Sequence, residues 1–181
     1  MRIAVPMMGK EAETLMRQAR AIAAYPGVDM AEWRADALER ALTPDAVCAI
    51  LPALLRALAD KPMIFTLRTE GGAARADYAA LLLTAARCGA PWIDVEALRC
   101  PDAAGLIASL HAQGCRVIAS HHDFDGTPAL PALLDQARAL RPERWKVSTL
   151  RAFPLATSTT HTFRRLSMKA SFRLSGDQVG S

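Results

Sequence analysis

Short apolar runs of β-forming residues alternate along this chain with longer runs whose apolar residues recur at helical spacing. The first pair is an extended run over 2–6 and an amphipathic run over 11–24, in which Leu15, Ala19 and Ile22 share one face. Further runs predict strands at 28–34, 62–68, 92–96, 116–120 and 145–150. Helices are predicted at 44–59, 75–88, 101–113 and 128–140, and Pro52 should kink or restart the first of these four.

The predicted strands end every 25 to 34 residues, which is the spacing of successive βα units. Strands that alternate with helices in this way form a parallel sheet. No glycine-rich dinucleotide loop follows the first strand, so the pattern favours an α/β fold of the (β/α)8 TIM-barrel type over a doubly wound sheet. A complete barrel typically takes about 250 residues, and this chain has 181, so we expect a barrel that is incomplete at its C-terminus.

The regular pattern fades in the last part of the chain. Residues 1–181 are expected to form a single barrel domain, with 151–181 a divergent, shortened C-terminal segment. Serine and threonine crowd residues 157–162 and leave no helical stripe there, and a seventh strand is predicted to begin within 164–167.

Composition places the chain among ordinary globular proteins, with 51% hydrophobic and 22% charged residues. No apolar run reaches the roughly 20 residues that a membrane helix needs, and the N-terminal apolar stretch is too short for a signal peptide. We therefore expect a cytoplasmic protein with no membrane contact. Cys48, Cys88, Cys100 and Cys115 form no metal-binding pattern and are expected to be reduced thiols packed as small hydrophobes.

The net charge of +4 is unevenly placed, because residues 141–181 hold eight basic and two acidic side chains. A basic tail can bind nucleic acid or an anionic surface, but no recognised nucleic-acid-binding motif accompanies this one. We expect no nucleic-acid partner. Tail-mediated binding remains an alternative that a salt-dependent shift assay would expose.

Charged residues gather at the predicted strand ends, where barrel enzymes place their reactive groups. The second strand ends with Glu32, Arg34 and Asp36, which the two-residue period of a strand places on one face. Charges that point into a barrel must pair or bind something polar. A closing salt-bridge network and a substrate-binding site explain this feature equally well. Arg68 and Glu70 share a face after the third strand in the same way.

The fifth strand runs into two histidines, the side chains best suited to acid–base chemistry near neutral pH. Adjacent residues of a strand point to opposite faces, so His121 and His122 would not bind one metal ion together, whereas His121 and Asp123 could. The sixth strand carries Lys146 between Trp and Val. A desolvated lysine has a lowered pKa and becomes a nucleophile toward carbonyls. The alternative is a snorkelling edge lysine, but the neighbouring histidine favours an imine.

Several stretches together resemble the type I 3-dehydroquinate dehydratases. They are Glu32-Trp33-Arg34-Ala35-Asp36, Phe65-Thr66-Leu67-Arg68 with Glu70-Gly71-Gly72, Ile93-Asp94-Val95-Glu96, and Ser120-His121-His122-Asp123-Phe124 with Thr127-Pro128. They occur in the family's order, and the resemblance extends from residue 1 to about residue 140. It implies a TIM-barrel lyase and homodimer that dehydrates 3-dehydroquinate to 3-dehydroshikimate, a step of the shikimate pathway of aromatic amino acid biosynthesis.

The resemblance also implies roles for individual residues. Lys146 would form a covalent imine, or Schiff base, with the substrate ketone, so that no metal and no cofactor is needed. His122 would move the proton that the imine makes acidic, and Glu70 would orient His122. The substrate-binding residues implied are Glu32, Arg34, Arg68 and Arg173.

Two other functions remain open. The chain could be a degenerate, catalytically impaired member of the family that acts as a binding or interaction protein. A metal-assisted barrel enzyme using His121 and Asp123 is the other alternative, and it predicts bound metal and inhibition by a chelator.

Overall fold

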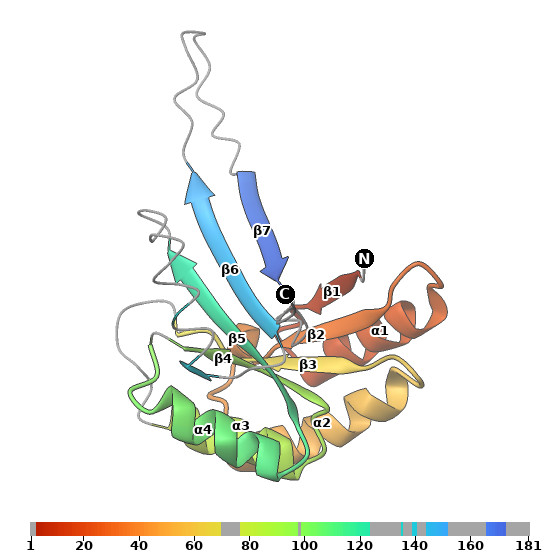
Figure 1. The fold of residues 1–181 in the computed structure, drawn as a ribbon. Coiled ribbons are helices and arrows are strands. Elements are labelled where there is room, and N and C mark those ends of the chain that lie inside the picture. Colours follow the sequence, from red (N-terminus) through yellow and green to blue (C-terminus); the bar gives the residue numbers. More distant parts are fainter. Residues whose placement is uncertain are drawn as a thin grey trace, which may run out of the picture.

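Seven strands form one sheet in the computed structural model, which describes residues 3–69, 77–97, 99–123, 135, 139–140, 144–151 and 166–172. Over 144–151 and 166–172 the description covers the backbone alone. The strands are β1 (Ala4–Met7), β2 (Met30–Arg34), β3 (Met63–Thr66), β4 (Trp92–Glu96), β5 (Arg116–Asp123), β6 (Arg144–Arg151) and β7 (Leu166–Phe172). Neighbours in the sheet follow the order of the chain, and β1 to β6 are parallel (Figure 1).

Helices cover one face of this sheet (Figure 1). They are α1 (Ala12–Ala24), α2 (Pro44–Ala57), α3 (Tyr78–Arg87) and α4 (Ala103–Ala112), with a short 3-10 turn, η1 (Ala35–Ala37), after β2. The start of α2 follows from local chemistry, since the Thr43 hydroxyl accepts the Ala46 N–H at 3.2 Å there. Gly89 and Gly114 follow α3 and α4 with φ of 95° and 79°, a left-handed conformation that suits glycine.

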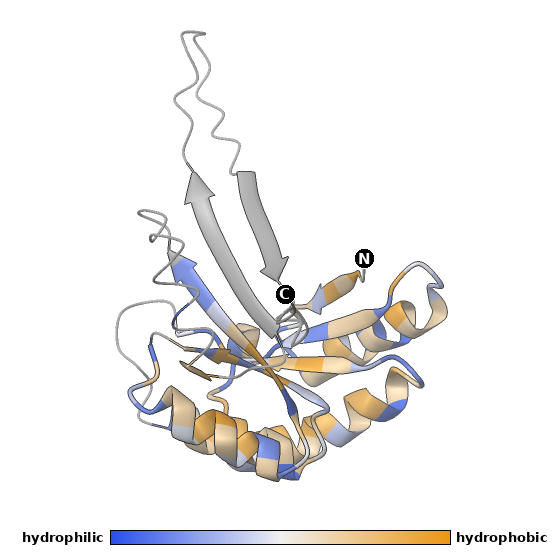
Figure 2. Ribbon diagram, viewed as in Figure 1, coloured by the Kyte–Doolittle hydropathy of each residue, from blue (hydrophilic) through white to orange (hydrophobic). Residues whose placement is uncertain are grey.

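The period-two pattern of the strands separates two faces of the sheet. Residues in register share a face, and the row Trp33, Phe65, Ile93 and Val117 is fully buried in the main core with residues of α1–α4. Figure 2 shows hydrophobic positions on both the strands and the helices of this layer. The opposite, inner face carries a smaller apolar cluster of Met30, Ile64, Trp92 and Ile118. Toward the carboxyl ends of the strands, this inner face becomes polar.

The expected fold class is confirmed, with two local differences. The seventh strand exists, but β7 runs antiparallel to β6. Of the kink or restart expected at Pro52, the restart is wrong, because α2 continues from 44 to 57 with Pro52 inside it. Buried Leu51 and Leu54 flank this proline in the helix, and their packing offsets the lost backbone hydrogen bond. The predicted helix at 128–140 lies outside the described residues except for positions 135, 139 and 140.

Two of the four cysteines correct the expectation of reduced thiols. Cys48 of α2 and Cys88 at the end of α3 form a disulfide, with their Cα atoms 5.6 Å apart. The two lie 40 positions apart in sequence, so only the packing of α2 on α3 brings them together. The expectation is confirmed for Cys100 and Cys115, which are free thiols. Burial raises the pKa of both, which keeps them protonated and unreactive.

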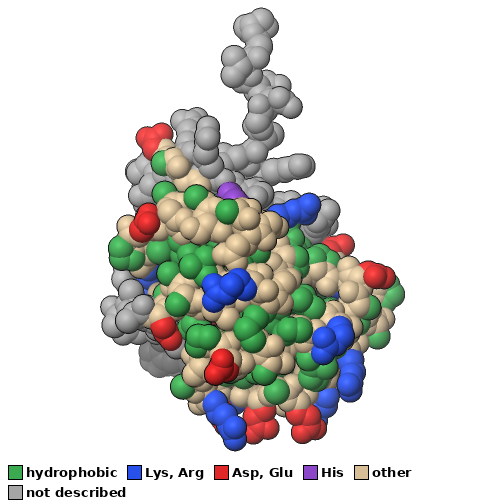
Figure 3. Space-filling model, turned by 90° about the horizontal axis from the view of Figure 1, so that it is seen from below, with side chains coloured by type: hydrophobic (Ala, Val, Ile, Leu, Met, Phe, Trp, Pro, Cys, Tyr) green, Lys and Arg blue, Asp and Glu red, His purple; other side chains and the backbone are tan. Residues whose placement is uncertain are grey.

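No large field of one charge sign covers the face of the molecule seen in Figure 3. Basic and acidic side chains are interspersed there among hydrophobic ones. None of the helices within the described part of the chain is long and apolar enough to cross a membrane.

Candidate active site

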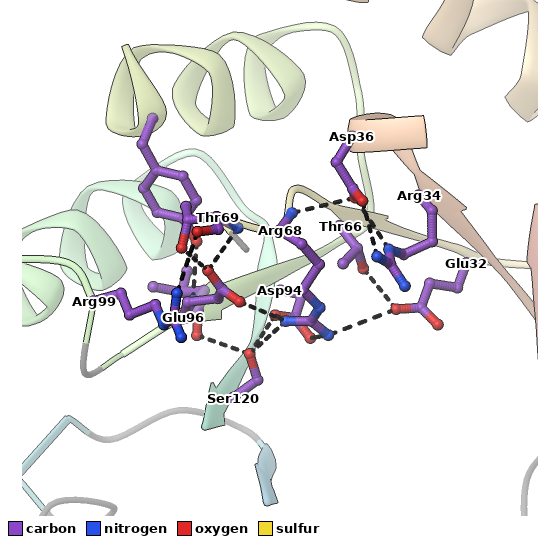
Figure 4. Close-up of polar contacts among 12 residues, drawn as sticks. Glu32, Arg34, Asp36, Thr66, Arg68, Thr69, Asp94, Glu96, Arg99 and Ser120 are labelled. Atoms are coloured by element: carbon purple, nitrogen blue, oxygen red, sulfur yellow. Dashed lines mark hydrogen bonds and ion pairs between the residues drawn. The ribbon is translucent and has the colours of Figure 1, made fainter. Parts of the chain in front are cut away.

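The polar end of the inner face is built around one buried guanidinium (Figure 4). Arg68 follows β3, and its Nη1 lies 3.0 Å from Asp94 Oδ1 on β4 and donates to the Ser120 hydroxyl on β5, also at 3.0 Å. The Ser120 hydroxyl in turn donates to Asp94 Oδ1 at 2.5 Å. All three side chains are buried, so three consecutive strands are joined by charge-assisted hydrogen bonds shielded from water.

A second group of contacts ties the end of β2 to the same cluster. Glu32 Oε1 accepts the Thr66 hydroxyl at 2.9 Å and lies 4.0 Å from Arg68 Nη2. Arg34 forms a two-pronged ion pair with Asp36, with contacts of 3.0 and 2.8 Å. Asp36 stands in η1 rather than on β2, so the strand period does not place its side chain; instead Asp36 Oδ1 also accepts the Arg68 backbone N–H at 3.2 Å. The salt-bridge network that the sequence offered as one explanation of these charges is therefore present, and substrate binding by the same residues remains a prediction.

Glu96 completes the cluster at the end of β4. Its Oε1 lies 3.5 Å from Arg68 Nη1, and its Oε2 accepts the Thr69 backbone N–H at 3.0 Å and the Thr69 hydroxyl. The backbone N–H of Glu96 donates to the Tyr78 hydroxyl at 2.9 Å. Arg99, which follows β4, donates to the carbonyl of Thr69 at 3.2 Å (Figure 4).

The cluster carries excess negative charge. Among the described residues, the buried carboxylates of Glu32, Asp94 and Glu96 surround the buried guanidinium of Arg68. Burial alone would lower the pKa of Arg68, but the attraction of these carboxylates outweighs burial, and the pKa lies above its ordinary value. Burial also raises the pKa of the Tyr78 hydroxyl. Arg68 is therefore a permanent cation and Tyr78 a neutral hydroxyl.

Strand register places Lys146 and His122 beside this cluster. Lys146 on β6 is the register partner of Ser120, and His122 on β5 is the partner of Ser148. Register partners lie on one face of the sheet, so His122, Ser120 and Lys146 belong to the inner face. His121 pairs with Val147 and belongs to the outer face, which confirms that the two histidines are split between the faces.

Two predicted site residues, Glu70 and Arg173, lie outside the described residues. The structure adds five residues to which the sequence assigned no role in the site: Thr66, Thr69, Asp94, Glu96 and Ser120. Their signal was present, because Asp94 and Glu96 alternate on β4 as Glu32 and Arg34 do on β2. Nothing in the sequence alone showed that these acids would meet Arg68.

The structure offers no support for a metal centre within its described side chains, because no group of three or more His, Cys, Asp or Glu is arranged there to hold an ion. The side chain of Asp123, one half of the metal alternative, is outside that description.

Parallel strands in chain order, with helices on one face and polar groups at the carboxyl ends, define the TIM-barrel class, whose active sites lie at those ends. A type I 3-dehydroquinate dehydratase from Clostridium difficile, solved with covalently modified comenic acid, aligns with a TM-score of 0.74 at 25% identity over 82% of this chain and 62% of that one. A family model described as type I 3-dehydroquinase matches residues 3–166. The chain belongs to the type I 3-dehydroquinase family.

Curated relatives agree with this assignment. The 3-dehydroquinate dehydratase of Bacillus subtilis (strain 168) is 32% identical over 148 residues, covering 77% of this chain and 57% of the relative. That of Bacillus licheniformis is 35% identical over 144 residues, covering 76% and 56%. The chain thus spans less than two thirds of the length of these relatives.

Proposed function

We propose that this chain removes water from 3-dehydroquinate to give 3-dehydroshikimate, through a Schiff base on Lys146. The observation that carries the proposal is the register of β5 and β6, which pairs Lys146 with Ser120, a residue of the buried Arg68–Asp94 cluster. His122 stands two residues beyond Ser120 on the same face. Imine chemistry needs a lysine as nucleophile, an acid–base group such as histidine near it, and donors and acceptors for the substrate. This face of the sheet carries all three.

In the proposed reaction, the Lys146 amine adds to the substrate ketone and water leaves as the imine forms. The protonated imine draws electrons from the neighbouring carbon, so a C–H bond there becomes acidic. His122 removes that proton, and the electron pair forms a double bond as the hydroxyl group leaves with a proton from His122. Water then hydrolyses the imine and frees Lys146. The imine nitrogen supplies the electron sink, so the proposal needs no metal and no cofactor.

The excess negative charge of the cluster determines how an anionic substrate can lie. Glu32, Asp94 and Glu96 repel a carboxylate, so that end of the site suits the substrate hydroxyls, with Glu32 as acceptor and Arg68 and Arg34 as donors. The substrate carboxylate then requires a cation elsewhere, and Arg173 is the residue proposed for it. Glu70 is proposed to orient His122.

The role in the shikimate pathway, the cytoplasmic location and the homodimer expected from the resemblance remain part of this proposal. Sedimentation velocity on the 181-residue chain tests the dimer directly, because monomer and dimer differ twofold in mass.

A direct assay tests the activity. Loss of water creates a conjugated enone, whose ultraviolet absorbance rises as 3-dehydroshikimate accumulates. We expect turnover by the parent chain and by Lys10→Ala, a control at an exposed lysine that contacts Glu39, and none by Lys146→Ala. A folded parent chain without turnover would instead support the degenerate, binding-only member of the family.

A further inference from the structure

One residue, Glu96, holds the chain on both sides of the stretch 70–76. Its carboxylate binds the backbone N–H and the hydroxyl of Thr69, which directly precedes that stretch. Its backbone N–H donates at 2.9 Å to the hydroxyl of Tyr78, the first residue of α3, which follows the stretch. Glu96 is only 3% exposed, so water does not compete for these bonds.

Two further contacts strengthen the hold on Thr69 and its neighbour. Arg99, from the loop after β4, donates to the Thr69 carbonyl at 3.2 Å. Glu96 Oε1 lies 3.5 Å from the Arg68 guanidinium. The backbone N–H of Thr69 thus bonds the last residue of β4, and its carbonyl bonds a residue of the loop after β4. The Glu96 carboxylate also contacts Arg68, the residue before Thr69.

We propose that Glu96 is a positioning residue, which fixes Arg68 and both anchor points of the stretch that begins with Glu70. This inference rests on the proposed function, in which Arg68 binds substrate and Glu70 orients His122. Glu96 acts through these residues and does not touch the reacting atoms. Hydrogen bonds to a buried carboxylate are stronger than neutral ones, so loss of one of them should weaken the hold on Thr69 or Tyr78 and leave the sheet folded.

Conservative variants remove one anchor at a time. Thr69→Val deletes the hydroxyl bond to Glu96 and keeps the backbone bond, and Tyr78→Phe deletes the acceptor of the Glu96 N–H. Thr84→Val is the matched control, because the Thr84 hydroxyl bonds Ala80 within α3, away from the site. Tyr25→Phe is the second control, at an exposed tyrosine.

A milder variant protects the test against a failure to fold. Arg99→Met removes the bond to the Thr69 carbonyl. Arg99 is exposed, so its replacement should not disturb the core.

Two readouts on the full chain test the proposal. Trypsin cleavage at Arg75, followed by mass spectrometry, should be about tenfold faster or more in Thr69→Val and Tyr78→Phe. In the same variants kcat should fall about ten- to hundredfold, while borohydride still traps the substrate on Lys146. Thr84→Val and Tyr25→Phe should match the parent in both readouts, and Arg99→Met should shift both in the same direction but less.

Two results would overturn the proposal. Cleavage at Arg75 that is unchanged in the anchor variants would show that Glu96 does not hold the stretch. Faster cleavage with an unchanged kcat would show that Glu96 holds this part of the chain but does not position residues for the reaction. The proposed function fails separately, if the parent chain forms no adduct on Lys146. If the proposed function fails in this way, the rate of cleavage at Arg75 still tests the hold by Glu96. Faster cleavage in Thr69→Val and Tyr78→Phe would support that hold, and an unchanged rate would exclude it.

Discussion

Arg68 and Asp94 form a buried ion pair that joins the end of β3 to the end of β4. Their Nη1 and Oδ1 atoms are 3.0 Å apart, and the side chains are only 4% and 1% exposed. A pair in this setting stabilises the fold less than its short distance suggests, because both charges lose their hydration. Replacing only one of the two residues by an uncharged one is costly, because the remaining charge stays buried without its partner.

The first prediction concerns the cost of removing one charge of this buried ion pair. Arg68→Met should lower the free energy of unfolding by about 3–5 kcal/mol, since it leaves buried carboxylates without a cation. Urea unfolding followed by circular dichroism measures the loss. Arg87→Met is the control, at an exposed arginine that contacts Thr84, and it should cost less than about 1 kcal/mol. Equal losses in the two variants would show that the cluster is not the buried network described.

The second prediction uses the opposite faces of two adjacent histidines. His122→Ala should lower kcat by about 10²–10⁴-fold, because a proton transfer loses its acid–base group. His121→Ala changes the neighbouring residue on the outer face and should leave kcat within a few fold. Steady-state rates with 3-dehydroquinate compare the two.

A reversed order in this comparison would favour the metal-assisted alternative. In that case chelator treatment should abolish activity, and metal analysis of the purified chain should find a bound ion. The imine mechanism predicts neither result.

The third prediction concerns the disulfide between Cys48 and Cys88. Thiol titration of the unfolded oxidised chain should find two free thiols, and peptide mapping should recover the peptides of Cys48 and Cys88 joined. Cys48 is exposed, so a mild reductant should open the bond. Reduction should lower the free energy of unfolding by about 2–4 kcal/mol, because the unfolded chain regains freedom. Four free thiols in an oxidised sample would contradict the pairing.

The fourth prediction follows from the raised pKa of Tyr78. Above the ordinary tyrosine value of 10.0, the hydroxyl ionises in the unfolded chain but stays protonated in the folded one. The unfolded state is then favoured, so Tyr78 contributes stability that is full below this value and declines above it. By about pH 11 the contribution should fall by about 1.4 kcal/mol.

Urea unfolding at about pH 8 and pH 11 tests this. The parent and Tyr25→Phe should lose more stability between the two values than Tyr78→Phe does. The same loss in all three would show that Tyr78 ionises equally in both states.

Much of the fold could be predicted from the sequence, because hydrophobic period and turn residues are local signals. All six parallel strands were expected within two or three residues of their observed ends, and Trp92–Glu96 was expected as observed. Helix α2 was harder at Pro52, where packing of Leu51 and Leu54 outweighs a local helix-breaking signal. The disulfide was missed because it depends on how two helices pack, which no local pattern records.

The candidate site was predictable in its residue types and only partly in its contacts. Glu32, Arg34, Arg68 and His122 were identified from strand-end parity and the family resemblance. The contacts of Arg68 with Asp94 and Ser120 could not be predicted. Arg68 lies beyond the end of β3, where the two-residue period of a strand no longer indicates the direction of a side chain. The catalytic and substrate-binding roles remain predictions for all seven residues: Glu32, Arg34, Arg68, Glu70, His122, Lys146 and Arg173.

The most direct test of the account is borohydride trapping of the imine. The full chain is mixed with 3-dehydroquinate and sodium borohydride, and its mass is compared with those of Lys146→Ala and Lys10→Ala. The imine mechanism predicts a ligand-sized mass increase in the parent and in Lys10→Ala, located on Lys146 by peptide mapping, and none in Lys146→Ala. A folded parent chain without the increase, or an adduct that survives in Lys146→Ala, would contradict it.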